Sequence, residues 1–169
     1  MNRLMLSICL VVVGFGLALN VQADEYSPEN LQVFAQKKEV VAAMKAFKAT
    51  FGAFRQQNGL TDLKDLRSSV HSYYQNDFSK AYAKKNDKPA PNLESTFSPL
   101  DDDSIALQYY YISANSHPLG KKDDLSRAHD KSKWSEQHEK YHPLFRSHLK
   151  EYGLYDVFLV DIESGDIIY

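Results

Sequence analysis

The final segment of the chain, YDVFLVDIESGDIIY, places the strongest constraint on the fold. Residues 157–160 form a continuous apolar run, which is typical of a strand buried on both faces of a sheet. Asp161 and Ser164-Gly165-Asp166 supply turn residues, and a second apolar run follows them. The segment 155–169 therefore predicts a β-hairpin. Because a lone two-stranded hairpin is marginally stable in water, we expect helices or another chain to support it.

Four helical segments are predicted ahead of this hairpin. They are expected from 27 to about 57, from about 62 until KKNDKPAPN, from 99 through SIALQYYYISAN, and from about 133 to 152. Ser27 is the expected N-cap of the first helix, and Gly153 is expected to end the last one. Asp101, Asp102 and Asp103 suit the start of the third helix. The predicted fold class is mostly α, α+β, with four helices followed by a C-terminal β-hairpin.

Residues 1–23 have the pattern of a secretory signal peptide. Arg3 precedes an apolar core, and Val21-Gln22-Ala23 forms a cleavage site, so the mature chain is expected to begin at Asp24 and to be periplasmic, with no membrane attachment. The alternative is an uncleaved anchor in the inner membrane, although the apolar run of roughly 16 residues is shorter than the ~20 that a spanning helix needs. Residues 24–169 suffice for one helical domain.

Composition excludes several classes of function. A formal net charge of -2 gives no electrostatic basis for binding nucleic acid. Cys9 is the single cysteine and lies in the predicted leader, so the mature chain is expected to have no disulfide, no thiol nucleophile and no cysteine-bound zinc. The sequence also contains no glycine-rich phosphate loop and no G-x-S-x-G motif, and we therefore predict a protein that is not an enzyme.

The segment HEKYH matches the H-E-x-x-H signature of zinc peptidases. Helical geometry argues against a zinc peptidase, because His138 and His142 fall on the apolar face of their helix whereas Glu139 points away from it. Pro143 also follows directly where a peptidase helix should keep its backbone bonds. The favoured interpretation is a pair of half-buried histidines with hydrogen-bonded rings, and no metal or cofactor is predicted.

A tyrosine cluster in LQYYYISANSHPLG is the other candidate for chemistry. Tyrosines followed by Asn115, Ser116 and His117 offer aromatic walls and short hydrogen-bonding side chains, as in many small-ligand pockets. Alternatively, the tyrosines pack in the core while their hydroxyls reach the surface, which composition alone favours.

From Leu107 onward the chain resembles the extracytoplasmic Cache-like sensor region of bacterial chemoreceptors and related transmembrane signalling proteins. The matching blocks are LQYYYISAN, HEKYHP, and YDVFLVD with SGDIIY. The resemblance implies a long helix leading into a PAS-like antiparallel sheet that cups a small ligand, with no catalytic residue. Members of the family carry a membrane anchor, further strands and an output module. We therefore expect this chain to be a truncated sensor domain.

The predicted function is that of an exported, sensor-like protein that binds a small molecule. Aromatic walls, hydrogen-bonding groups and an anion-pairing group are expected from Tyr109, Tyr111, Asn115, His138, His142 and Arg146. Two alternatives stay open. The chain is either a non-functional remnant of a truncated sensor gene, or a periplasmic interaction module whose hairpin edge pairs with a partner chain.

Overall fold

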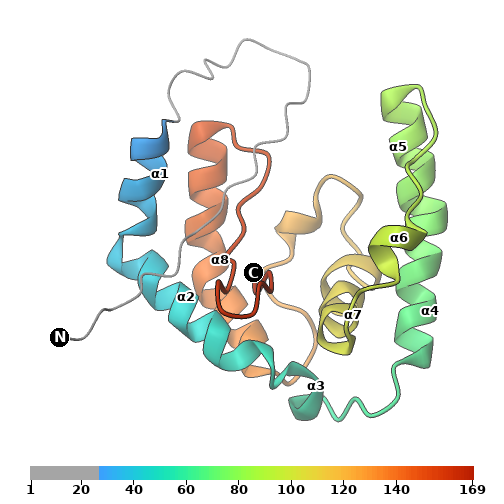
Figure 1. The fold of residues 1–169 in the computed structure, drawn as a ribbon, viewed down its shortest axis with the longest axis horizontal. Coiled ribbons are helices and arrows are strands. Elements are labelled where there is room, and N and C mark those ends of the chain that lie inside the picture. The colour runs from blue at the N-terminus through green and yellow to red at the C-terminus, as the bar shows by residue number, and fades with distance from the viewer. Residues whose placement is uncertain (1–26) are drawn as a thin grey trace. The chain divides into compact units, whose positions relative to one another are not determined.

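The computed structural model describes residues 27–169, and the predicted signal peptide lies outside the described residues. The described chain is helical and divides into two compact units (Figure 1). Unit 1 combines the residues up to Phe51 with Gln137–Tyr169, and unit 2 comprises Gly52–Glu136. Unit 2 is thus continuous in sequence, whereas unit 1 is assembled from two separate segments.

Unit 1 contains helices α1 (Pro28–Ala35) and α2 (Lys38–Phe51) and most of α8 (Lys133–Tyr152). The predicted cap is confirmed, since the backbone N–H of Asn30 donates to Ser27 Oγ at 3.3 Å. The predicted end of α8 is also confirmed, because Gly153 has a φ of 62°. The prediction of one unbroken helix from 27 to 57 is wrong. The chain leaves the helix at 36–37, between α1 and α2, and again at 52–53.

The core of unit 1 is built from aromatic rings. The Phe34 ring meets that of Phe145 edge-on, with centroids 6.2 Å apart. The Tyr169 ring lies 4.9 Å from Phe47 and 4.7 Å from Phe145. The three phenylalanines are at most 1% exposed. Rings contributed by α1, α2, α8 and the C-terminal segment therefore hold unit 1 together.

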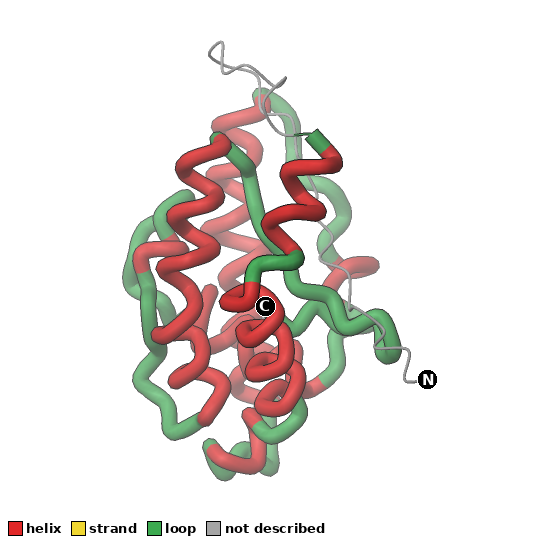
Figure 2. The backbone as a smooth tube through the Cα atoms, turned by 90° about the vertical axis from the view of Figure 1, so that its left-hand side faces the viewer, coloured by secondary structure: helices red, strands yellow, loops and turns green. Residues whose placement is uncertain are grey.

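The predicted β-hairpin at 155–169 is wrong. The structure assigns no strand within residues 27–169, as the helix-and-loop tube of Figure 2 shows. The predicted turn does form, with the N–H of Asp161 donating to the carbonyl of Asp166 at 2.9 Å. Leu159 adds two backbone hydrogen bonds between the arms, to Ile168 and Tyr169. These bonds do not amount to a strand, and the arms carry an isolated antiparallel bridge from Val160 to Ile167. The α+β, Cache- or PAS-like fold class is therefore contradicted.

Side-chain burial explains this correction. Val157 and Leu159 are 4% and 1% exposed, whereas the intervening Phe158 is half-buried and Ile162 is exposed. The segment thus buries one face, and the expectation of burial on both faces is wrong. Lys48 of α2 holds the turn by an ion pair with Asp161, with Nζ and Oδ1 3.0 Å apart. Helices supply the burial that a sheet was expected to provide.

Unit 2 is a set of short helical elements. These are α3 (Phe54–Gln57), α4 (Lys64–Tyr73), the π-helix η2 (Tyr74–Phe78), α5 (Ser79–Asn86), α6 (Glu94–Phe97), α7 (Asp102–Gln108), the π-helix η3 (Tyr109–Ser113), the 3₁₀-helix η4 (Lys122–Asp124) and the first turn of α8. The predicted helices that begin near 62 and 99 are confirmed, and Asp101 caps α7 by accepting from the N–H of Ser104 at 2.7 Å. The sequence did not predict α6.

Five of these elements join end to end into two continuous rods that pack together. Residues 64–86 form one rod through α4, η2 and α5, and residues 102–113 form another through α7 and η3. α7 packs alongside α4 in Figure 1. A hydrogen bond joins the rods where they turn π-helical, since the hydroxyl of Tyr74 donates to Gln108 Oε1 at 2.6 Å. Single π-helical turns inside α-helices are often found at functional sites.

Candidate functional site

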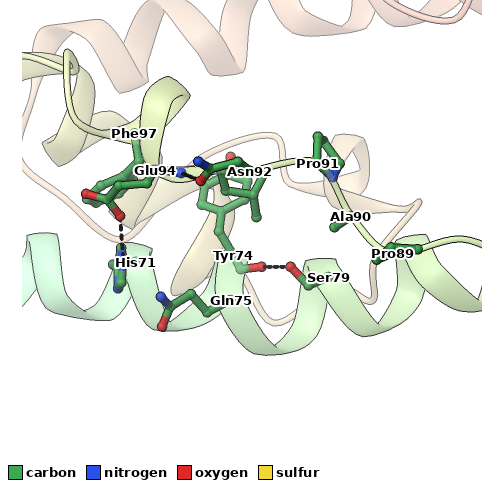
Figure 3. Close-up of a pocket in the computed structure, with 11 residues that line it drawn as sticks. His71, Tyr74, Gln75, Ser79, Pro89, Ala90, Pro91, Asn92, Glu94 and Phe97 are labelled. Carbon is green, nitrogen blue, oxygen red and sulfur yellow. Dashed lines mark hydrogen bonds and ion pairs between the residues drawn. The ribbon is translucent and has the colours of Figure 1, made fainter.

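The clearest ligand-sized hollow described in unit 2 is a pocket of about 510 Å³ beside the rod 64–86. Its other wall is the connection from Pro89 to α6. Figure 3 shows His71 and Tyr74 rising from the rod toward Glu94 and Asn92 on that connection. The lining residues are His71, Tyr74, Gln75, Ser79, Pro89, Ala90, Pro91, Asn92, Leu93, Glu94 and Phe97. This volume is within the range of known small-molecule sites.

The local sequence explains why the connection stands off from the rod. Asp87, with a φ of 50°, ends α5 in the left-handed conformation. Pro89 and Pro91 follow, and neither can donate a backbone hydrogen bond or continue a helix. Asn92 turns the chain just before α6, because its Oδ1 accepts from the N–H of Glu94 at 3.0 Å. A proline-stiffened segment thus runs back along the rod and leaves a hollow beside it.

One pair of charged or titratable groups crosses the pocket. His71 Nε2 lies 3.2 Å from Glu94 Oε2, and the His71 ring meets the edge of Phe97 with centroids 5.1 Å apart. The Glu94 side chain remains 64% exposed, so its carboxylate is accessible to solvent. Phe97, the last residue of α6, is itself buried and lines the pocket. The pocket therefore combines an aromatic wall with an accessible carboxylate.

The π-helical turn η2 shapes the centre of the pocket. The carbonyl of Tyr74 accepts the backbone N–H of Ser79, five residues on, and also the Ser79 hydroxyl, whose Oγ lies 2.7 Å away. Burial raises the pKa of Tyr74 to about 12, and the neighbouring Tyr73 shifts it in the same direction, while the hydrogen bond to Gln108 opposes the shift. The hydroxyl is therefore neutral at physiological pH and acts as a hydrogen-bond donor.

A smaller, more apolar hollow of about 120 Å³ adjoins the pocket. It is lined by Tyr74, Leu93, Phe97, Leu100 and Gln108. Tyr74, Leu93 and Phe97 line both hollows. The site thus has a larger compartment with both polar and apolar walls, called the outer compartment below, and a smaller apolar one, called the inner compartment, and the two share three walls.

Three sequence-predicted site residues lie elsewhere in unit 2. Tyr111 donates its hydroxyl to Ser135 Oγ at 2.7 Å and accepts from the N–H of Ala128 at 3.3 Å, and burial raises its pKa to about 12. Asn115 is 6% exposed and lies in the loop after η3. Tyr109 is half-buried and begins η3. None of these three side chains lines the two hollows described above.

Asn115 organises its own loop through hydrogen bonds within the chain. Its Nδ2 donates to the carbonyls of Tyr111 at 2.9 Å and Lys122 at 3.0 Å, and its Oδ1 accepts from the N–H of His117 at 2.9 Å. Lys122 Nζ returns a bond of 2.6 Å to the carbonyl of Asn115. The side-chain amide of Asn115 therefore closes the loop between η3 and η4.

The other three predicted site residues, His138, His142 and Arg146, lie one turn apart on α8, in unit 1. The rings of His138 and His142 are stacked, with centroids 4.4 Å apart and an interplanar angle of 19°. His142 Nδ1 lies 2.6 Å from the hydroxyl of Tyr169. Both histidines are buried, at 6% and 8% exposure, and Arg146 is half-buried. The predicted ligand residues are thus divided between the two units.

The structure also bears on the zinc-peptidase motif. Glu139 is exposed while His138 and His142 are buried, as the helical pattern predicted. Among residues 27–169, no group of three or more His, Cys, Asp or Glu side chains is arranged to hold a metal ion. The described helices also include none that is long and apolar enough to cross a membrane.

The sequence reasoning missed the pocket residues His71, Glu94 and Phe97 and the buried His148. The His148 ring stacks on Phe34 at 3.5 Å, and burial, followed by the charge of Lys37, lowers its pKa below 6.5. The two prolines after a helix were the available signal for the pocket, since such a segment can neither join the helix nor pair with a strand.

The chain shows no match to known proteins by which this site could be identified. No protein-family model matches it, and neither a curated protein nor a solved structure is significantly similar to it. The assignment of a function therefore depends on the chemistry of the residues themselves.

Proposed function

We propose that this chain is an exported, non-enzymatic protein that binds a small molecule in the pocket between α4–η2–α5 and the connection to α6. The observation that carries the proposal is a hollow of about 510 Å³ in which Tyr74 and Phe97 supply aromatic walls and His71 and Glu94 supply polar contacts. A small set of polar groups in a largely preformed concave site is the usual arrangement for ligand binding.

The resemblance to bacterial sensor regions from Leu107 onward supports the same class of function. It suggests that ligand binding serves a sensory role in the periplasm. The ligand site proposed here is nevertheless not the cup of a PAS-like sheet, because residues 27–169 contain no assigned strand. The pocket belongs to helical unit 2 and depends on residues of that unit alone.

A screen for thermal stabilisation of the purified protein by a panel of metabolites tests the proposal. At least one ligand is expected to raise the melting temperature, because a ligand that binds only the folded state stabilises it by mass action. Ala90→Trp should abolish this shift, since Ala90 lines the outer compartment. Ala42→Trp, at an exposed position of α2 in unit 1, is the matched control. The absence of any shift across the panel would contradict the proposal.

A further inference from the structure

We infer that the pocket selects an organic cation that carries a compact apolar group, such as an arylalkyl ammonium ion. The inference rests on the proposed function, because it names the ligand class of the same pocket. It follows from the charges that line the outer compartment and from the size and apolar character of the inner one.

The charges of the outer compartment favour a cation. Its lining contains no lysine and no arginine, and its titratable groups are His71, Tyr74 and Glu94. An anionic ligand would meet the Glu94 carboxylate and would find His71 Nε2 already in contact with that carboxylate at 3.2 Å. An ammonium group would instead pair with Glu94, whose side chain is 64% exposed. The outer compartment is thus repulsive to carboxylates and attractive to amines.

Aromatic rings strengthen this preference. Phe97 and Tyr74 line both compartments, and the His71 ring packs edge-on against Phe97 at 5.1 Å. A cation over the face of an aromatic ring gains about 0.5–1 kcal/mol at an exposed site. An ammonium group at Glu94 would therefore have both a counter-ion and nearby aromatic surface.

The inner compartment limits the size of the apolar group that the ligand can carry. Its volume of about 120 Å³ is close to that of engineered apolar cavities that bind benzene, at ~150 Å³. Leu93, Leu100 and Phe97 supply apolar contacts there, and the hydroxyl of Tyr74 is already engaged by Gln108 at 2.6 Å. A single ring or a short branched alkyl group suits this space, whereas a charged group would lose its hydration without gaining a counter-ion.

Calorimetric titration of the purified protein with four probes, at fixed pH and ionic strength, tests the inference. Phenethylammonium, phenethyl alcohol and hydrocinnamate share one ring and one linker but differ in charge, and ethylammonium lacks the ring. Phenethylammonium is expected to bind about fivefold more tightly than the alcohol, because a pair with an exposed carboxylate contributes up to ~1 kcal/mol. Hydrocinnamate should bind more weakly than the alcohol, and ethylammonium more weakly than phenethylammonium.

Two variants separate the contributions of charge and shape. Glu94→Gln should remove the preference for phenethylammonium over the alcohol, whereas Glu39→Gln, an exposed glutamate of α2, should leave it unchanged. Leu100→Trp should fill the inner compartment and reduce binding of phenethylammonium to that of ethylammonium. Leu119→Trp, at a residue 45% exposed and outside both linings, is its control.

The inference is overturned if phenethylammonium does not bind, if hydrocinnamate binds as tightly, or if Glu94→Gln leaves the preference unchanged. In those cases the proposed function still stands if a ligand of another class stabilises the protein and Ala90→Trp abolishes the effect. The proposed function itself fails if neither these probes nor the metabolite panel binds.

Discussion

The pocket and the interior polar clusters use similar side chains in opposite ways. At the pocket, His71 and Glu94 pair across a hollow and keep part of their surface in solvent. In the interior, Asn115 and His142 are almost fully buried, and they hydrogen-bond to Tyr111 and Tyr169 of the fold itself. Polar side chains next to apolar residues, such as Asn115 and His142, are therefore buried here. A buried side chain of this kind is not accessible to a ligand. The clusters stabilise the fold, and the pocket leaves polar groups available to a ligand.

Among the variants that test this comparison, Asn115→Ala is expected to lose the most stability. This change removes three hydrogen bonds and leaves two carbonyls and one N–H without their partner, so we expect a loss of about 2–3 kcal/mol in the free energy of unfolding. Urea unfolding measures it. Asn86→Ala is the control, because Asn86 is exposed and its side chain makes one bond, to the carbonyl of Tyr82. Equal losses in both variants would contradict the role assigned to Asn115.

Two tyrosines of unit 2, Tyr111 and Tyr73, provide a matched test of what a hydroxyl contributes. Tyr111→Phe should lose about 1–2 kcal/mol, because the hydroxyl serves Ser135 and Ala128. Tyr73→Phe should leave stability unchanged or raise it by up to ~1 kcal/mol, since the Tyr73 hydroxyl is buried and has no hydrogen-bond partner among the described residues. Urea unfolding of both variants measures these changes. A larger loss of unfolding free energy in Tyr73→Phe than in Tyr111→Phe would contradict the prediction.

The interior histidine His148 should make the free energy of unfolding depend on pH. The pKa of His148 is lowered by burial and then by Lys37, against a smaller opposing contribution from Glu151. Because its folded pKa lies below 6.5, the unfolded chain binds the proton more readily, and stability that is complete above 6.5 declines as the pH falls below it. His148→Phe should keep the ring contact with Phe34 and flatten the decline. Urea unfolding at a series of pH values measures this. If the midpoint of unfolding falls with pH as steeply in His148→Phe as in the unaltered protein, the prediction is contradicted.

The smallest expected effect on stability lies at the pocket. Glu94→Gln should change the free energy of unfolding by less than about 0.5 kcal/mol, because the contact of Glu94 with His71 is partly exposed and exposed contacts of this kind contribute little. The same variant should remove the preference for phenethylammonium over phenethyl alcohol. Glu94 is therefore expected to matter for binding and to contribute little to stability. A large loss of stability, measured by urea unfolding, would place Glu94 among the structural residues and remove the contrast with the interior.

Local signals predicted the helices better than the sheet. The predicted cap Ser27 and the predicted stop Gly153 act within one turn, and the structure confirms both. Asp101, predicted only as part of an acidic helix start, proves to be the cap of α7. The apolar run 157–160 was wrong as a strand because burial on one face by helices satisfies the same residues. Whether an apolar run of this kind forms a strand depends on tertiary contacts, and the local sequence pattern does not reveal those contacts.

The pocket was harder to predict than the buried residues. Its walls come from the rod that carries His71 and from the connection together with α6, which carries Glu94, and no sequence spacing links these two regions. From the sequence, KKNDKPAPN was predicted only to end a helix, whereas in the structure Pro89 and Pro91 line the pocket and α6 returns Phe97 to the core. The six predicted site residues, in contrast, were selected for polarity on apolar faces. Their participation in ligand binding stays a prediction.

Mapping of ligand-induced changes in backbone amide chemical shifts tests the central claim most directly. On saturation with a ligand found by the thermal screen, we expect the largest changes at His71, Gln75, Glu94 and Phe97, with the amides of Asn115 and His142 unchanged. The largest changes at Asn115, His138 and His142, with the pocket residues silent, would contradict the claim that the hollow beside the rod 64–86 is the ligand site.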